Sequence, residues 1–254
     1  MKTPESTRNT TADVVKRLSR NGTFLGGPLK SFELAGNCQL GILLHFGLTP
    51  ESKVLDVGCG CLRGGRKIIP ELNEACYFGI EPNKSMLKDG IEISLDPDVV
   101  LDKKPRFDTN AEWNFGVFNT KFDFVIARSI WSHASKRDIT KMLEEFSKWK
   151  KPGAKFITSY HRAAIPIFGD YHGNVWVGKS HVSDKSGAVR HSLLRIQMLC
   201  EERGLTVREV SSNKYDFGTQ KWLVIEQQNG RKYFSYGNIA RVLFFLLTIY
   251  IWIL

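Results

Sequence analysis

The sequence predicts a doubly wound α/β domain, with a mostly parallel seven-stranded sheet and helices on both of its faces. The first observation is an alternation between residues 53 and 226, where short apolar runs of strand length are separated by segments of helix length. Such alternation is typical of parallel strands joined by crossover helices. The second is a glycine-rich turn directly after the first apolar run, the place where open α/β sheets bind ligands. A chain of 254 residues has room for one such domain.

The amino-terminal half should contain two leading helices and the first two strands. The leading helices are expected at Ala12–Arg20 and Phe32–Phe46, the second of them ending at Gly47. The elements expected next are a strand at Lys53–Val57, a glycine-rich turn with a helix through Leu72, a strand at Tyr77–Ile80 and a helix at Lys84–Ile93.

The carboxyl-terminal half begins with a polar segment, Asp96–Asn114, which contains prolines and should form a long loop before a short strand near Phe115–Phe118. The elements expected after it are a strand at Phe122–Ala127, a helix at Lys136–Trp149, a turn at Lys151–Gly153, a strand at Lys155–Tyr160, a helix near Val189–Arg203, and strands near Thr206–Val210 and Trp222–Glu226.

The composition is that of a folded protein with an excess of positive charge. Hydrophobic residues make up 42% and charged residues 24% of the chain, which excludes wholesale disorder. The net charge of +10 suits a nucleic acid, an anionic membrane surface or an acidic substrate, and equally a well-solvated basic surface. No recognisable nucleic-acid-binding module accompanies the charge, so a nucleic-acid partner is not expected.

The cysteines and the amino terminus indicate a reducing compartment. The five cysteines are odd in number and irregularly spaced, and the first twenty residues contain no apolar core of a signal peptide. We therefore expect a cytoplasmic protein without a disulfide framework. The pair Cys59 and Cys61 lacks a second ligand pair nearby, so no metal site is predicted.

The last residues form an apolar segment, Ile239–Leu254, whose only charge is Arg241. As a helix it would measure roughly 20–24 Å, which is shorter than a hydrocarbon core of ~30 Å. Two interpretations stay open: a membrane-inserted tail, and a helix buried in the core or in a dimer interface. The predicted organisation is a polar arm with a helix at 1–31, a ligand-binding domain at 32–228, and a basic linker with an apolar helix at 229–254.

The glycine-rich turn, Gly58-Cys59-Gly60, follows an apolar strand that ends in Asp56 and Val57. Glycines allow the backbone to pass close to a ligand at the carboxyl end of the sheet. A dinucleotide-binding fold is the main rival, but its fingerprint requires a third glycine three residues after the second. That position is Arg63 here, which argues against a nicotinamide-dependent oxidoreductase.

A carboxylate follows the second strand. Glu81 lies 21 residues after Gly60, directly after Tyr77–Ile80. An ionised acid at this place accepts hydrogen bonds from ribose hydroxyls. Taken alone, Glu81 could equally be a solvated acid at a strand end or a charge at a helix N-terminus. The glycine-rich turn before it favours ribose binding.

The two segments together resemble the signature segments of class I S-adenosylmethionine-dependent methyltransferases. The matching runs are V-L-D-V-G-C-G-C-L-R-G-G at 54–65 and Y-F-G-I-E-P-N-K-S-M-L at 77–87, and they are most similar to a bacterial group carrying GCG-x-LRGG. Residues 122–133, 150–156 and 218–223 are similar to later segments of that group. The resemblance covers roughly residues 32–226 and implies a Rossmann-like methyltransferase sheet.

The resemblance also implies the cofactor and the residues around it. S-adenosylmethionine would be held by Asp56, Gly58, Cys59, Gly60, Glu81 and Pro82. Within this set, Glu81 would bind the ribose hydroxyls and Pro82 would shape the edge of the adenosine pocket. The residues implied beside the transferred methyl group are Arg128, Ser129 and His133. The polar residue expected to meet adenine after the third strand is not obvious, with Asp108 and Asn114 as candidates.

The resemblance implies transfer of a methyl group to an oxygen or nitrogen atom. The sulfonium is a good leaving group, so positioning can supply about 7–11 kcal/mol of the barrier reduction. His133 is the candidate base, and it could equally serve to fix a loop. The aromatic-rich segment Tyr160–Gly187 is expected to cover the acceptor.

Nothing in the sequence specifies the acceptor, for which a small or amphiphilic molecule is the expectation. A second function from a different class stays open, namely a membrane-tethered interaction module that binds S-adenosylmethionine without catalysis. Such a protein would bind the cofactor and show no turnover with any acceptor.

Overall fold

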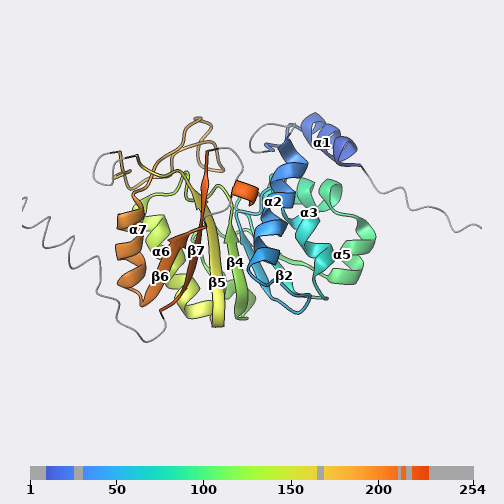
Figure 1. Ribbon diagram of the computed structural model, residues 1–254. Coiled ribbons are helices and arrows are strands. Elements are labelled where there is room, and N and C mark those ends of the chain that lie inside the picture. The colour runs from blue at the N-terminus through green and yellow to red at the C-terminus, as the bar shows by residue number, and fades with distance from the viewer. Residues whose placement is uncertain (1–9, 26–30, 165–168, 211–212, 216–218, 229–254) are drawn as a thin grey trace, which may run out of the picture.

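The computed structural model describes residues 10–25, 31–164, 169–210, 213–215 and 219–228. One seven-stranded sheet forms its centre (Figure 1). The strands are β1 (Val54–Val57), β2 (Tyr77–Ile80), β3 (Arg106–Asp108), β4 (Phe122–Ala127), β5 (Lys150–Tyr160), β6 (Leu205–Glu209) and β7 (Lys221–Gln227). The strand β7 alone runs in the opposite direction to the other six, so the predicted mostly parallel sheet is confirmed.

The strand order is β3-β2-β1-β4-β5-β7-β6. The chain therefore moves from β1 outward to β2 and β3, and then returns to the other side of β1 to form β4. Val54 pairs with Tyr77 of β2 on one side and with Phe124 of β4 on the other. Such a reversal leaves a crevice at the carboxyl ends of the two strands that flank it, which are β1 and β4 here.

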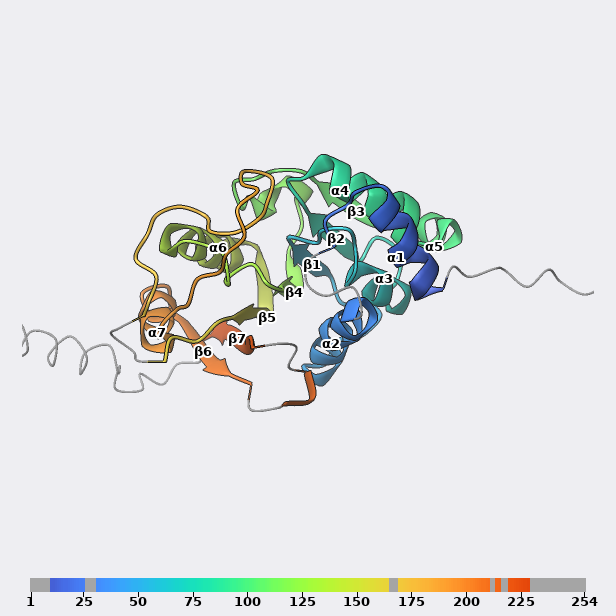
Figure 2. The same cartoon turned by 90° about the horizontal axis from the view of Figure 1, so that it is seen from above.

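Helices cover both faces of the sheet, as the sequence predicts (Figure 2). They are α1 (Thr11–Arg20), α2 (Phe32–His45), α3 (Gly65–Ile68), α4 (Lys84–Asp89), α5 (Pro97–Lys103), α6 (Lys136–Trp149) and α7 (Leu193–Glu201). One apolar core lies between the sheet and α6 and α7, and a second lies between the sheet and α2 to α5. Along β4, Val125 faces the first core and Phe124 and Ile126 face the second, the period of two expected of a strand.

The helix α6 shows how the sequence determines an element next to the site. Ser135 caps its first turn in a reciprocal arrangement with Asp138, so two otherwise unsatisfied N–H groups are bonded. Its buried side chains recur at helical spacing: Ile139, Met142, Leu143 and Phe146. The predicted range of this helix agrees with the observed one.

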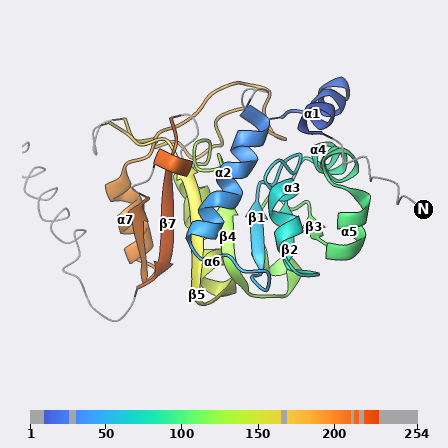
Figure 3. The same ribbon diagram turned by 45° about the vertical axis from the view of Figure 1, so that its right-hand side comes forward.

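The first two helices pack beside the glycine-rich turn (Figure 3). Val14 and Leu18 of α1 share a small apolar cluster with Phe32 of α2, Cys61 and Ile93. Within the described residues, no helix is both long enough and apolar enough to cross a bilayer. Residues 1–9 and the apolar segment 239–254 lie outside the described part, and the domain boundaries stay predictions.

Two predictions around the third strand are wrong. The segment Asp96–Asn114 is not a long loop, because it contains α5 and β3. Asp96 caps α5 by accepting from the Asp98 N–H, and Pro97 occupies the first helical position. The run Phe115–Phe118 is a 3₁₀ helix rather than a strand. The run is apolar because Phe115 and Phe118 pack into the core against the sheet, although their backbone forms no strand.

Smaller differences concern the ends of elements. The helix predicted to run through Leu72 is α3 followed by a 3₁₀ turn at Ile69–Glu71, and α4 continues into a π-helical turn at Gly90–Ser94. The strand β5 begins at Lys150 rather than after the predicted turn Lys151–Gly153. Its register against β4 shifts between Phe122 and Phe124, so the predicted turn forms an irregularity inside the strand.

Candidate functional site

The glycine-rich turn lies at the carboxyl end of β1 and is tied to β2. The N–H groups of Gly58 and Cys59 both donate to the Ile80 carbonyl, at 2.8 and 3.1 Å. Gly58 and Gly60 have φ angles of +70° and +58°, the left-handed region that favours glycine. The turn therefore brings its backbone to the end of β2 in a conformation that other residues adopt only with strain.

The two glycines serve different packing needs. A Cβ atom on Gly58 would lie 2.2 Å from Cδ1 of Ile130, so the missing side chain lets the segment after β4 pack against the turn. A Cβ atom on Gly60 would meet only Sδ of Met86, at 3.6 Å, among atoms within 4 Å. A ligand can therefore approach the backbone at Gly60, whereas Ile130 occupies the space beside Gly58.

Glu81 is a buried carboxylate, 8% exposed, at the end of β2. Its Oε2 accepts from the Gly60 N–H at 3.0 Å and its Oε1 from the Asn83 N–H at 2.8 Å. Burial raises the pKa of Glu81, and the two N–H groups oppose that rise because they stabilise the charged form. A carboxylate has about four lone-pair sites, so Glu81 can still accept from two hydroxyl groups of a ligand.

Asp56 lies on the neighbouring strand and is 2% exposed. Its Oδ2 accepts from the Tyr77 hydroxyl at 2.7 Å, because Asp56 and Tyr77 point to the same face of adjacent strands. The pKa of Asp56 is raised to about 7, mainly by burial. The hydrogen bond from Tyr77 opposes this rise, and the charge of Glu81 adds to it. A buried acid that titrates near neutrality beside a second acid is typical of functional sites.

The two cysteines of the turn are buried thiols. Desolvation raises the pKa of Cys61 to about 11, and it raises that of Cys59 well above its usual value. Such thiols stay protonated at neutral pH, whereas metal ligation requires the thiolate. Among the described residues, no cluster of three or more histidine, cysteine or acidic side chains could hold a metal ion.

A network of neutral side chains surrounds Arg128 and Ser129 at the carboxyl end of β4. Arg128 donates to the hydroxyl of Ser129, to that of Ser159 at 3.2 Å, and to Oε1 of Gln220. Because a guanidinium only donates, the Gln220 oxygen must face it, and Gln220 Nε2 must face the Ser129 hydroxyl at 3.0 Å. Ser129 has a φ of +60°, a strained conformation often found at functional sites.

His133 joins the segment after β4 to the loop after β5. Its Nδ1 donates to the Val177 carbonyl at 2.7 Å, and its own carbonyl accepts from the Val177 N–H at 2.9 Å. Its ring stacks on Trp176 with centroids 5.4 Å apart, and Trp176 stacks on Trp113 at 6.2 Å. Burial lowers the pKa of His133, so the ring is neutral at pH 7.

The loop after β5 arches over the carboxyl edge of the sheet (yellow to orange in Figure 2). Residues 169–191 of this loop contact the segment after β3 through Trp176. They also contact the segment after α1 through Lys179, whose Nζ lies 5.4 Å from the Phe24 ring centroid. At its base, buried Asp170 accepts from the Ser192 N–H at 3.0 Å and from Arg195. The loop therefore covers part of this edge, and its residues 169–191 are called the lid below.

Comparison with known proteins agrees with this geometry. Residues 55–156 match a family model described as a methyltransferase domain. Magnesium protoporphyrin IX methyltransferase from Synechocystis PCC 6803, solved with bound SAH, aligns with a TM-score of 0.56 and 16% identity over 86% of this chain and 95% of that one. The chain has the class I methyltransferase fold. The same Synechocystis enzyme has also been solved with bound SAM.

Other solved methyltransferases are similar. An S-adenosylmethionine-dependent methyltransferase from Clostridium acetobutylicum ATCC 824 has a TM-score of 0.55 and 14% identity over 86% of this chain and 98% of its own. A glycopeptide N-methyltransferase complexed with sinefungin has a TM-score of 0.57 and 12% identity over 76% of this chain and 94% of its own. At these identities the likeness concerns the fold. The bacterial subgroup suggested by the glycine-rich motif stays a prediction.

The site residues predicted from the sequence fall into three places. Five of them gather around the turn after β1 and the end of β2, with half-buried Pro82 beside them: Asp56, Gly58, Cys59, Gly60 and Glu81. Arg128 and Ser129 lie at the end of β4, and His133 lies under the lid. The adenine candidates Asp108 and Asn114 both bond to Asn110, a residue the sequence analysis missed.

Proposed function

We propose that this chain is an S-adenosylmethionine-dependent methyltransferase that transfers a methyl group to an oxygen or nitrogen atom of a small or amphiphilic molecule. The supporting observation is the Glu81 carboxylate, which the Gly60 and Asn83 N–H groups hold beside the glycine-rich turn. A fixed, buried carboxylate at the end of β2 suits the two hydroxyls of a ribose, because both of its oxygens keep acceptor capacity.

The residues present fit the cofactor. Space is open at Gly60, where a Cβ atom would meet only Met86 Sδ. In this proposal the turn, Asp56 and Gly58-Cys59-Gly60, lines the methionine portion and the sugar, Glu81 binds the ribose hydroxyls, and Pro82 shapes the edge of the adenosine pocket. Because β3 lies beside β2 on the side away from β1, the adenine would extend toward residues 109–114.

When bound, S-adenosylmethionine supplies a methyl group on a positively charged sulfur, already activated for transfer. The chain's own residues then have to orient the acceptor and exclude water. The Ser129 hydroxyl accepts from Arg128 and from Gln220 Nε2, and its own hydrogen makes only a long bond of 3.4 Å to Gln220 Oε1. An acceptor molecule could take that hydrogen in place of Gln220. We assign Arg128 and Ser129 to this orienting role.

His133 is proposed as the base for acceptors that carry a proton. Its Nδ1–H is fixed on the Val177 carbonyl, so the lone pair of the neutral ring is on Nε2. The same bond fixes the lid, and the two roles are compatible because they use different nitrogens.

The class of acceptor is proposed from the lid. It brings Trp176 over the carboxyl edge, and aromatic surface of this kind suits a small or amphiphilic molecule. The similar structures include methyltransferases named for a magnesium protoporphyrin and for a glycopeptide, and none of these names refers to a nucleic acid.

Calorimetric titration of the full chain with S-adenosylmethionine and separately with NADH tests the proposal. Micromolar binding of the former, weakened strongly in Glu81→Ala, would support the cofactor site, and a screen of acceptors would then follow. Preference for NADH, or no binding of S-adenosylmethionine, would overturn it. Cofactor binding without turnover on any acceptor would instead favour a non-catalytic binding module.

A further inference from the structure

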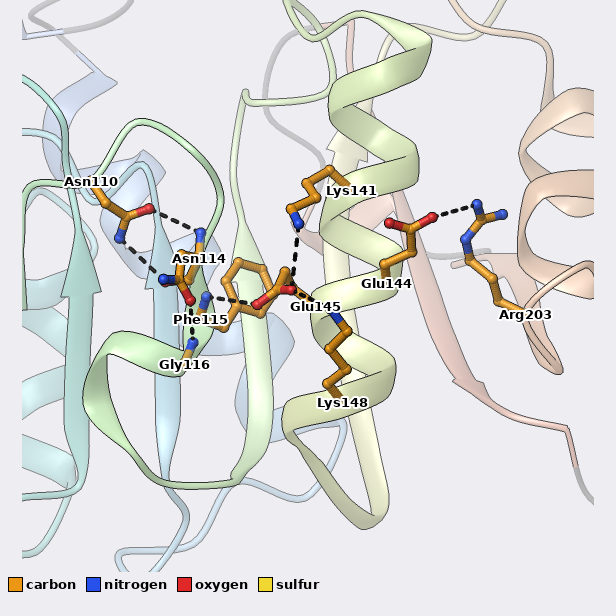
Figure 4. Close-up of polar contacts among 9 residues, drawn as sticks. All are labelled: Asn110, Asn114, Phe115, Gly116, Lys141, Glu144, Glu145, Lys148 and Arg203. Carbon is orange, nitrogen blue, oxygen red and sulfur yellow. Dashed lines mark hydrogen bonds and ion pairs between the residues drawn. The ribbon is translucent and has the colours of Figure 1, made fainter.

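The segment after β3 is attached to α6 through a buried carboxylate. The side chain of Glu145 is 6% exposed, and its Oε2 accepts from the Phe115 N–H at 3.2 Å (Figure 4). Phe115 is the first residue of the 3₁₀ helix Phe115–Phe118, so its N–H lacks a partner within that helix. Because Phe115 is fully buried, loss of Glu145 would leave this donor unsatisfied or would force the segment to move.

Two lysines stabilise the charge of that carboxylate. Lys148 Nζ lies 3.0 Å and Lys141 Nζ 3.7 Å from Glu145 Oε1, one turn of the helix on either side (Figure 4). The hydrogen bond to Phe115 is therefore made to an ion-paired acceptor, and such bonds are stronger than those between neutral groups. The bond fixes the start of the 3₁₀ helix against the middle of α6.

The segment before Phe115 is held together by its own hydrogen bonds, so a displacement of Phe115 would also displace this segment. Asn110 Oδ1 accepts from the Asn114 N–H at 2.9 Å, and Asn110 Nδ2 donates to the Asn114 carbonyl at 3.2 Å. Asn114 Oδ1 in turn accepts from the Gly116 N–H at 2.9 Å (Figure 4). A second attachment comes from Trp113, whose Nε1 donates to Asp138 of α6 at 3.0 Å.

This segment lies next to the proposed ribose site. The Glu81 N–H donates to the Asp108 carbonyl at 3.0 Å, and residues 109–114 follow directly. A nucleoside whose ribose is held by Glu81 has the glycine-rich turn on one side and this segment on the other. We propose that Glu145 is a positioning residue that fixes residues 109–114 for recognition of the adenine base, an inference that rests on the proposed assignment of Glu81 to the ribose.

The test compares two cofactor products that differ only in the base. Full-length protein is titrated calorimetrically with S-adenosylhomocysteine and with S-inosylhomocysteine, in which the hydrogen-bonding edge of the base is changed. The variants are Glu145→Ala, which removes the acceptor, and Glu145→Gln, whose amide oxygen can still accept from Phe115. Glu144→Gln is the matched control, since Glu144 pairs with Arg203 at 2.9 Å on the other side of α6 (Figure 4).

We expect the wild type and Glu144→Gln to prefer S-adenosylhomocysteine by about tenfold, the value of one well-placed hydrogen bond. Glu145→Ala should narrow that preference to about twofold, and Glu145→Gln should restore it. An equal loss of affinity for both ligands in Glu145→Ala would show a purely structural role and overturn the inference, as would a wild type without preference.

Two further measurements distinguish failure of this inference from failure of the proposed function and from failure of a variant to fold. Failure of the wild type to bind S-adenosylhomocysteine at all would overturn the proposed function itself. If Glu145→Ala does not fold, Trp113→Phe removes the other attachment to α6 while keeping an aromatic ring. It should narrow the preference in the same way, and an unchanged preference would count against the proposal.

Discussion

The Gly60 N–H donates to Oε2 of Glu81 at 3.0 Å, which joins the glycine-rich turn to the end of the neighbouring strand. This bond orients the carboxylate proposed to hold the ribose. Glu81→Ala should raise the Kd for S-adenosylhomocysteine by about 10- to 100-fold, because hydrogen bonds to charged groups are lost. Calorimetric titration measures the change.

Two variants make that result interpretable. Glu81→Gln should fall between the wild type and Glu81→Ala, because its NH₂ group cannot accept from one of the two N–H groups that Glu81 now satisfies. Glu74→Ala is the control, since Glu74 is an exposed acid paired with Lys104. Wild-type affinity in Glu81→Ala would contradict the ribose assignment.

The two glycines of the turn should respond differently to alanine. Gly60→Ala should cost about 1–2 kcal/mol of unfolding free energy, the strain of a left-handed residue. Gly58→Ala should cost roughly 1–3 kcal/mol more, because its Cβ atom would meet Ile130 Cδ1 at 2.2 Å. Urea unfolding measures both values.

Gly60→Ala also separates stability from binding. The variant should remain folded yet bind S-adenosylhomocysteine weakly, because its methyl group would occupy the open space on the turn. A folded Gly60→Ala variant with unchanged affinity would place the ligand elsewhere.

Elements with a strong local pattern could be predicted from the sequence. The ranges of β2, β4 and α6 agree with the structure. The two strands are short apolar runs buried on both faces of the sheet, and the apolar residues of α6 recur at helical spacing. The third strand could not be predicted in this way. Arg106–Asp108 is three residues long, lies at the sheet edge and is partly exposed, so no apolar run marks it.

The helix α5 is a different case, because the sequence does contain the signals of its start. Asp96 and Pro97 are a capping residue followed by a proline at the first helical position. The prolines in Asp96–Asn114 favour a loop when they are weighed alone, and that prediction is wrong. The aromatic run Phe115–Phe118 predicts a strand, which is also wrong, because burial alone does not distinguish a strand from a short helix.

Some residues of the candidate site can be predicted from the sequence and others cannot. Gly58, Gly60 and Glu81 converge because the carboxyl ends of adjacent parallel strands meet at one edge, which sequence order alone implies. Tyr77, Gln220 and Glu145 could not be identified, because their partners are 21, 91 and 30 positions away and depend on strand register and helix packing. Tertiary structure selects such partners.

Asp56 should make stability depend on pH. Burial raises its pKa from 3.8 to about 7, so between these values the folded state binds more protons than the unfolded state. The contribution of Asp56 is therefore fully present below about pH 4 and is lost as the pH rises through about 7, by up to about 4 kcal/mol. Asp56→Asn keeps an acceptor for Tyr77 and removes this dependence.

The measurement is urea unfolding of the wild type and Asp56→Asn at pH 5 and pH 8. Taking the difference between the two proteins removes the contribution of buried histidines such as His133, whose pKa is lowered by desolvation and which destabilise the fold in acid. The variant should lose less stability than the wild type on going to pH 8. Exposed Asp102→Asn serves as the control, and an Asp56→Asn result identical to it would refute the prediction.

His133 should hold the lid through its Nδ1–H. The bond to the Val177 carbonyl and the stack on Trp176 are both lost in His133→Ala. Amide hydrogen exchange of residues 171–187 should then become about tenfold faster or more, since a local opening loses at least one buried hydrogen bond. Exchange measured with and without S-adenosylhomocysteine checks this in the folded protein.

His133→Gln separates the lid contact from base catalysis. A glutamine amide can donate to the Val177 carbonyl, so exchange in residues 171–187 should return toward that of the wild type. It cannot take up a proton, so methyl transfer to an acceptor found by screening should stay low if Nε2 is the base. Full turnover in His133→Gln with normal cofactor affinity would remove the base role and leave His133 as the residue that holds the lid. Low turnover with a protected lid would establish that the second nitrogen is needed for the chemistry.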